Sequence, residues 1–336
     1  MKQPLMASEV GILWTSYQND SMSCCILSHM LRYAEDQEIK KTIESALDIA
    51  SIHIEKLTRL FEKENYAKPT GFTEKDVNLN APRLFSDAFC ITYINHMAKA
   101  GMLGYSGMLA MSAREDIVEY YSKALLETRN LYESTLKVMI KNGLYVRAPY
   151  IPLPSETDYV DSSQYLSGLN PFSKKRPLNA IEISHLFLNI QTNSIGVKLC
   201  LAFGQTSPRT EVQEFLLRGK QISEKQMAVF TRTLLDNNIS APTSPDECVT
   251  KTTTQIFSDQ LVMFHMSLLS AAGTGNYATA AAASQRSDLA INYERLSFEI
   301  ARYAKQGADI MIKNNWLEQP PGTIDREKLV RDKGEA

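Results

Sequence analysis

The chain has 336 residues, of which 44% are hydrophobic and 22% are charged. Its 36 basic and 38 acidic residues leave a net charge of −2, which offers no basic field to attract nucleic acid. The sequence contains no apolar run of the length of a membrane span or a signal peptide, so we expect neither. Its five cysteines form no CxxC pair, which is typical of a reduced, cytoplasmic chain.

The first 143 residues carry four long segments in which apolar side chains recur at helical spacing. These segments cover residues 8–33, 36–64, 82–104 and 112–142. The connection between the second and third segments, NYAKPTGFTEKDVNLNAP, is long enough when extended to run much of the length of a bundle. Four helices with one long connection in this place form the ferritin-like arrangement, and a simple up-down bundle is the alternative topology.

Residues 144–178 differ from the rest of the chain because they combine five prolines with aromatic residues and lack a helical period. This composition is too apolar for a free linker, so we expect an extended strap lying against one or both bundles.

Four further helical segments follow at residues 179–206, 208–237, 249–272 and 284–315, before a tail from residue 317. Asn179 and Glu182 have the spacing of a capping box at the start of the first of them. Glycines near 101–104 and 273–275 fall at the predicted ends of the third helix in each set, where glycine often stops a helix.

The two sets of helices are copies of one unit. A shift of 172 residues superposes nine identical residues between positions 112 and 143, including Met-Ile-Lys-Asn at 139–142. Earlier in the chain a shift of 173 matches Glu9 with Glu182 and Gln18 with Gln191. We therefore predict an all-α protein of two tandem ferritin-like four-helix bundles, residues 1–143 and 179–316. A duplicated chain also favours a pseudo-twofold arrangement of the bundles.

Several motifs of the second copy resemble an uncharacterised, spore-coat-like protein family of Bacillus-type spore formers. They are RPLNAIEISHLFLNIQTNSIGVKLCLAFGQ at residues 176–205, FSDQL at 257–261, SQRSD at 284–288 and NNWLEQPP at 314–321. The resemblance implies one or two ferritin-type helical bundles and a setting in the sporulating cell or spore. It implies no reaction.

A ferritin-like fold raises the question of a di-metal centre, which needs Glu on two helices and Glu-x-x-His on the other two. The one Glu-x-x-His in the chain is Glu182 with His185, in the first turn of its helix, where Glu182 can also act as a cap. This pair is the metal-site candidate. A mixed mid-bundle set of Asp20, His53, His96 and Glu127 is a weaker one.

We expect no catalytic residues, because the nucleotide-binding, hydrolase and metalloprotease motifs are absent from the sequence. The leading hypothesis is a structural or interaction protein of a spore former, located in the mother-cell cytoplasm or on the spore, with protein partners or self-association and no cofactor. One alternative is an iron or manganese oxidase, catalase-like enzyme or metal store. The other is a carrier of an apolar small molecule, which predicts a sizeable apolar cavity with few polar groups.

Overall fold

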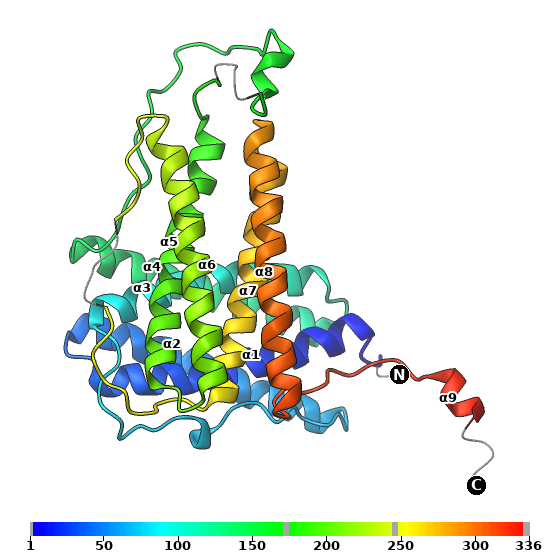
Figure 1. Cartoon of the computed structure of the whole chain (residues 1–336). Coiled ribbons are helices and arrows are strands. Elements are labelled where there is room, and N and C mark those ends of the chain that lie inside the picture. The colour runs from blue at the N-terminus through cyan, green and yellow to red at the C-terminus, as the bar shows by residue number, and fades with distance from the viewer. Residues whose placement is uncertain (1–2, 171–174, 244–247, 332–336) are drawn as a thin grey trace.

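The computed structural model describes residues 3–170, 175–243 and 248–331, and these residues form an all-α protein in two repeated halves (Figure 1). Parts of the expected strap (171–174), of the loop before the seventh helix (244–247) and of the tail (332–336) lie outside the described residues. Half one contains α1 (Ala7–Tyr33), α2 (Gln37–Lys63), α3 (Asp87–Ala110) and α4 (Glu115–Lys141). Half two contains α5 (Ala180–Thr206), α6 (Thr210–Leu235), α7 (Asp259–Ala283) and α8 (Ser287–Lys313).

The long connection after α2 crosses half one lengthwise. In half one, α3 begins beside the turn between α1 and α2, where the Asp87 carboxylate accepts hydrogen bonds from the backbone N–H groups of Glu35 (3.0 Å) and Asp36 (2.7 Å). The turn before α4 lies at the start of α1, where Glu9 accepts a bond of 2.8 Å from the backbone of Arg114. A simple up-down order would place the start of α3 at the opposite end of α1.

The ends of the helices follow from local chemistry. Ser86 and Ser258 of the repeated Phe-Ser-Asp motif are the N-caps of α3 and α7, since each hydroxyl accepts a backbone N–H of the first turn. Beyond the ends of α2, α6 and α8, asparagines at positions 65, 238 and 315 have positive φ angles, a conformation that asparagine tolerates better than most residues.

The sequence-based ends of the third helices were wrong. Both α3 and α7 start later than the predicted residues 82 and 249, and they continue through their glycines to Ala110 and Ala283. Glycine does not stop a helix whose neighbours hold it in place, because its cost of about 1 kcal/mol is small against tertiary packing. Gly101 and Gly273 instead let side chains of the next helix, Thr128 and Ile300, approach closely.

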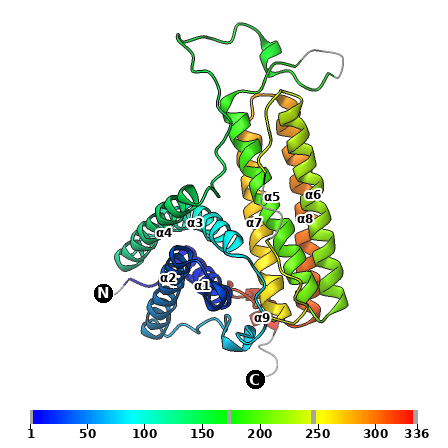
Figure 2. The same cartoon turned by 90° about the vertical axis from the view of Figure 1, so that its left-hand side faces the viewer.

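The two halves meet about a pseudo-twofold axis. Val77 forms an antiparallel bridge with Phe257, and Phe85 forms the same bridge with Val249. The two bridges are equivalent under the 172-residue repeat, because Val77 corresponds to Val249 and Phe85 corresponds to Phe257. The hydroxyl of Tyr93 lies 3.1 Å from Nε2 of His265, which is the equivalent position in half two. The helices of half one consequently run across those of half two (Figures 1 and 2).

The junction between the halves contains the largest hydrophobic cluster. It joins side chains such as Phe85 and Phe89 of half one to Phe203 and Phe257 of half two. Two smaller clusters fill the outer ends of the bundles. Because one continuous core spans both copies, they behave as parts of a single folded body.

The strap connects the bundles along their outer side. Figure 1 shows it rising from α4 along half two to the far end of that bundle. Leu144 and Tyr145 pack against the central cluster, whereas Tyr150, Leu153 and Tyr159 are 83–87% exposed. Past Trp316, Glu318 returns to half one and bonds Gln18 (2.6 Å), and the short α9 (Arg326–Arg331) lies apart from both bundles.

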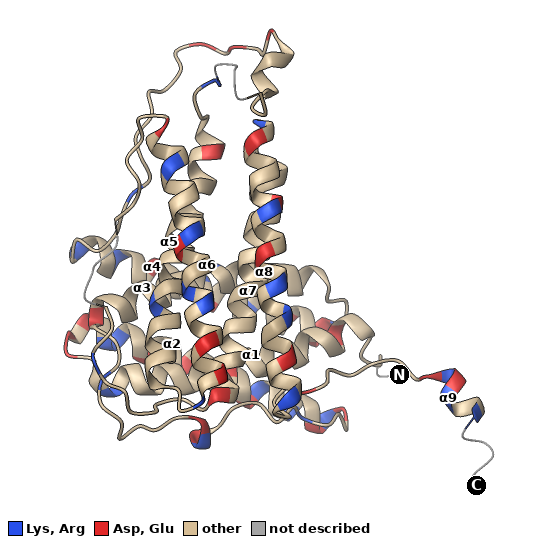
Figure 3. Cartoon of the chain, in the orientation of Figure 1, with Lys and Arg blue, Asp and Glu red and all other residues tan. Residues whose placement is uncertain are grey.

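Charged residues of both signs are interspersed along the helices (Figure 3). By length and composition, α5 is the one described helix that is apolar enough to cross a membrane. Most of that window, 61%, is buried inside the protein, so α5 has the character of a core helix.

Candidate functional site

A polar cluster occupies the middle of half one, with one side chain from each of its four helices. His53 of α2 places Nε2 3.0 Å from a Glu127 oxygen and Nδ1 3.5 Å from an Asp20 oxygen. The hydroxyl of Tyr105 on α3 donates a hydrogen bond of 3.2 Å to Asp20 and lies 3.3 Å from Nδ1 of His53. Asp20 comes from α1 and Glu127 from α4, so this cluster ties the whole half together.

The charges in this cluster depend on one another. Burial alone would lower the pKa of His53, but the bonds and charges of Asp20 and Glu127 outweigh it and raise that pKa above its ordinary value. Burial also raises the pKa of Asp20, against the opposing effect of His53 and Tyr105. The His53 ring thus lies between two carboxyl groups that both favour its charged form.

Half two repeats the cluster with neutral side chains at the positions of Asp20 and His53. The equivalent residues are Asn193, Gln226, Tyr277 and Glu299. The amide of Asn193 donates to the Tyr277 hydroxyl (2.7 Å), that hydroxyl donates to Gln226 (2.6 Å), and Gln226 donates to Glu299 (3.3 Å). The same geometry thus persists after Asp is replaced by Asn and His by Gln, which separates the structural role of the cluster from its charge.

A cavity of about 670 Å³ runs between the two halves and reaches both polar clusters. We call it the interbundle cavity. Its polar wall residues include Asp20 and Tyr105 on one side of the pseudo-twofold axis and Asn193, Gln226 and Tyr277 on the other. Between them the wall consists largely of alanine, leucine, isoleucine and methionine side chains. The arrangement can hold a molecule with a mostly apolar body and hydrogen-bonding groups at its ends.

Glycines are frequent in the cavity wall. Of the 15 glycines in the chain, six line the cavity, and they are Gly101, Gly104, Gly196, Gly219, Gly273 and Gly275. All six lie inside helices, where glycine costs stability relative to alanine. A side chain at 104 or 275 would meet no atom within 4 Å, so packing alone does not explain glycine at these two positions.

Comparisons with known proteins place the sequence in a family. The profile of a family described as "protein of unknown function (DUF3231)" matches residues 1–156 and again residues 166–329. The chain belongs to this family. It contains two copies of the family domain, in agreement with the internal repeat and with the resemblance to an uncharacterised family.

No curated protein matches the chain. Among solved structures, a putative spore coat protein from Bacillus halodurans is similar at 16% identity, with a TM-score of 0.42. The similarity covers 45% of this chain and 98% of that protein.

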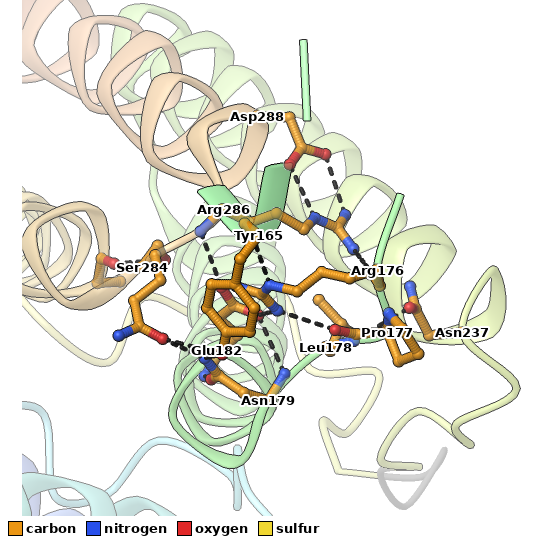
Figure 4. A network of polar contacts seen from close by, with 12 residues as sticks. Tyr165, Arg176, Pro177, Leu178, Asn179, Glu182, Asn237, Ser284, Arg286 and Asp288 are labelled. Atoms are coloured by element: carbon orange, nitrogen blue, oxygen red, sulfur yellow. Dashed lines mark hydrogen bonds and ion pairs between the residues drawn. The ribbon is translucent and has the colours of Figure 1, made fainter. Parts of the chain in front are cut away.

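Glu182, of the predicted metal pair Glu182 and His185, lies at the end of half two in a network of polar contacts (Figure 4). Both carboxylate oxygens of Glu182 are engaged, by the Arg176 guanidinium at 2.7 and 2.9 Å and by the backbone N–H groups of Asn179 and Arg286 at 3.0 Å each. The capping box of Asn179 and Glu182 is confirmed. His185 is half-buried and makes no hydrogen bond to Glu182, so a metal role for the pair stays a prediction.

The mid-bundle residues come together only in part. Asp20, His53 and Glu127 meet, whereas His96 lies on another face of α3 and lines the interbundle cavity. Their arrangement does not fit a di-iron or di-manganese centre, because both ring nitrogens of His53 are engaged by the carboxylates on either side of it. Within the described ranges, no three His, Cys, Asp or Glu side chains gather as metal ligands.

Sequence reasoning missed the tyrosines and the cavity. Tyr105 and Tyr277 are related by the 172-residue shift, as are Gly101 and Gly273. This recurrence was a usable signal, because a helical glycine kept in both copies indicates a packing or binding constraint.

Proposed function

We propose that this protein binds a small molecule with a predominantly apolar body in the interbundle cavity, as a carrier, store or sensor. The observation that supports this proposal is the cavity itself. Its volume of about 670 Å³ falls in the usual range of ligand sites, about 300–1,000 Å³. Mostly apolar walls with a few convergent polar groups are typical of such sites.

The wall chemistry favours binding over catalysis. The polar groups of half two bond mainly to one another, and those of half one form a closed set around His53. Such groups orient a ligand through the donors and acceptors that they still present to the cavity, such as the second lone pair of the Tyr277 oxygen. Release of water from apolar walls supplies most of the binding free energy.

The test fills the cavity without disturbing the fold. A Cβ added at Gly104 or Gly275 would meet no atom within 4 Å, and leucine has a better helix propensity than glycine, so the double leucine variant should remain folded. We expect wild-type protein to bind a neutral fluorescent probe such as N-phenyl-1-naphthylamine with about one site per chain, and the double variant to bind it at least about tenfold more weakly. Gly107→Leu, on the same helix but outside the cavity, is the matched control.

Equal probe binding by the wild-type and double-variant proteins would refute the proposal. Extraction of the purified protein with organic solvent, followed by mass spectrometry, tests it independently. A compound present in the wild-type extract and depleted in the extract of the double variant is the expected natural ligand.

A second candidate function is protein interaction in a spore former, with a place in the spore coat. The observation that favours it is the exposure of three large apolar side chains within one short stretch of the strap, Tyr150, Leu153 and Tyr159, since exposed apolar surface marks interaction sites. The setting comes from the family resemblance alone. Fluorescently tagged protein should then localise to the developing spore, and replacing these three residues with serine should release it to the mother-cell cytoplasm. Unchanged localisation would exclude a role for the strap.

A further inference from the structure

The interbundle cavity carries one charge that the protein does not balance. Of the described residues that line it, Asp20 and Lys99 bear full charges. Asp20 is already compensated by the His53 ion pair and the Tyr105 hydrogen bond. Lys99 has no hydrogen bond or ion pair with any described residue, and its ammonium group lies 6.0 Å from the centre of the Tyr132 ring. That distance is at the edge of the cation–π range.

Lys99 is also held away from water. Its side chain is half-buried, and burial lowers its pKa from the ordinary value. An amine whose charged form is disfavoured in this way gains when an anion comes beside it. The ligand-free protein carries the free-energy cost of leaving this ammonium group unpaired. A bound ligand with an acidic group would remove that cost.

A second donor faces the cavity from the same side of α3. His96 lies one turn before Lys99, at the i, i+3 spacing that places two side chains on one face. Burial and the Lys99 charge lower the pKa of His96 to about 4, so its ring is neutral near pH 7 and carries one N–H donor. An ammonium group and a neutral imidazole N–H side by side are suited to the two oxygens of a single acidic group.

The apolar lining of the cavity defines the rest of the ligand. Met97 and, from half two, Ile222, Leu268 and Leu269 line the same cavity. Tyr105 lies six residues after Lys99 on α3, about 9 Å along the helix axis, so the carboxylate of Asp20 is set apart from the ammonium group. The position equivalent to Lys99 in half two is Ala271, so the positive charge exists on one side of the pseudo-twofold axis only.

We propose that the ligand of the interbundle cavity is an amphiphile with one acidic head group, a carboxylate or a phosphate, bound by Lys99 and His96 with its hydrocarbon body between the halves. This inference rests on the proposed binding function and specifies the chemical class of the ligand. It also predicts a single binding orientation, with the head group at half one.

The test compares three ligands of equal chain length, hexadecanoate, hexadecyl phosphate and hexadecanol, as competitors of the neutral probe on delipidated full-length protein. We expect the preferred acid to bind about tenfold more tightly than the alcohol, the effect of one charge-assisted hydrogen bond in a partly exposed site. The tighter of the two acids identifies the head group as carboxylate or phosphate.

Variants of Lys99 then locate the head group. Lys99→Met keeps the apolar stem and should abolish the preference for the acid while leaving alcohol binding unchanged. Lys99→Arg should retain most of the preference. Lys137→Met, at an exposed lysine of α4 outside the cavity, is the control and should behave as wild type.

Two results would overturn the inference. Equal competition by acid and alcohol, while the neutral probe still binds, would refute the acidic head group and leave the proposed function intact. A preference for the acid that survives Lys99→Met would place the head group elsewhere. If the neutral probe and all three ligands fail to bind, the proposed function itself is refuted.

Discussion

The polar clusters in the middle of the two halves differ at two positions, and this difference allows a quantitative prediction about the stability of half one. Replacing both Asp20 by Asn and His53 by Gln copies the residues that half two already uses. Both side chains are almost fully buried, and removing one partner of a buried ion pair typically costs about 3–5 kcal/mol. His53 would keep Glu127 at 3.0 Å, so we expect Asp20→Asn alone to cost about 2 kcal/mol. His53→Gln alone removes the cation between two carboxylates and should cost about 3 kcal/mol.

The double variant should cost about 2 kcal/mol or less, because Asn193 and Gln226 satisfy the same geometry without charge. The single costs add to about 5 kcal/mol, so the expected coupling free energy is about 3 kcal/mol, at the upper end for residues in contact. The assay is denaturant unfolding followed by circular dichroism at pH 6. Arg129→Gln with Glu133→Gln, an exposed pair on α4, is the control and should show coupling below about 0.5 kcal/mol. Additive costs for Asp20 and His53 would refute the reasoning.

The same cluster sets a pH dependence of stability. The pKa of His53 is raised in the folded protein, so its stabilising contribution is fully present below its ordinary value of 6.5 and is lost as pH rises through the folded value. The raised pKa of Asp20 acts in the same direction, because the folded protein holds that proton more tightly than the unfolded chain. Wild-type protein should therefore lose stability as pH rises above 6.5, and the double variant should lose less.

Three further predictions concern the ends and the junction of the halves. Glu182→Gln should destabilise the protein by about 2–3 kcal/mol in chemical denaturation, since it leaves Arg176 without its carboxylate. Burial opposes the charge of Glu182, but these bonds outweigh burial and lower the pKa of Glu182 from its ordinary value of 4.5. The stability difference between wild type and variant should therefore disappear as pH falls below 4.5. A difference that stays constant with pH would show that it does not come from the Glu182 charge. Tyr93→Phe should cost about 1 kcal/mol through its bond to His265, and no change in unfolding midpoint would show that the bond contributes nothing. Gly219→Ala should cost about 1–3 kcal/mol, because the added methyl group would lie 3.0 Å from the Cys200 sulfur and against the Tyr303 hydroxyl; unchanged thermal stability would mean that both side chains can move aside.

The fold was predictable because the spacing of apolar residues along the sequence indicates where helices form. Apolar periodicity located eight long helices, and the repeat at 172–173 residues paired them into two copies. The ends of α3 and α7 were missed because glycine was judged by its intrinsic propensity, whereas tertiary packing holds Gly101 and Gly273 inside helices.

The candidate site was predictable only in fragments. Asp20, His53 and Glu127 could be picked out as mid-helix polar residues, but their contact depends on how four helices rotate about their axes, which spacing along one helix does not determine. The charge of Lys99 is visible in the sequence. That it has Tyr132 as a ring contact but no hydrogen-bond or ion-pair partner among the described residues is a property of the packed structure alone.

The strap that joins the halves has a consequence for how the protein responds to dilution. Two separate copies of one unit would meet at a rate and with an occupancy set by their concentration in the cell. Copies on one chain meet at an effective concentration on the order of millimolar for a short flexible linker, regardless of how many molecules are present. The interbundle cavity is therefore complete in every single molecule, so a cell with very few copies of this chain would still hold fully formed cavities.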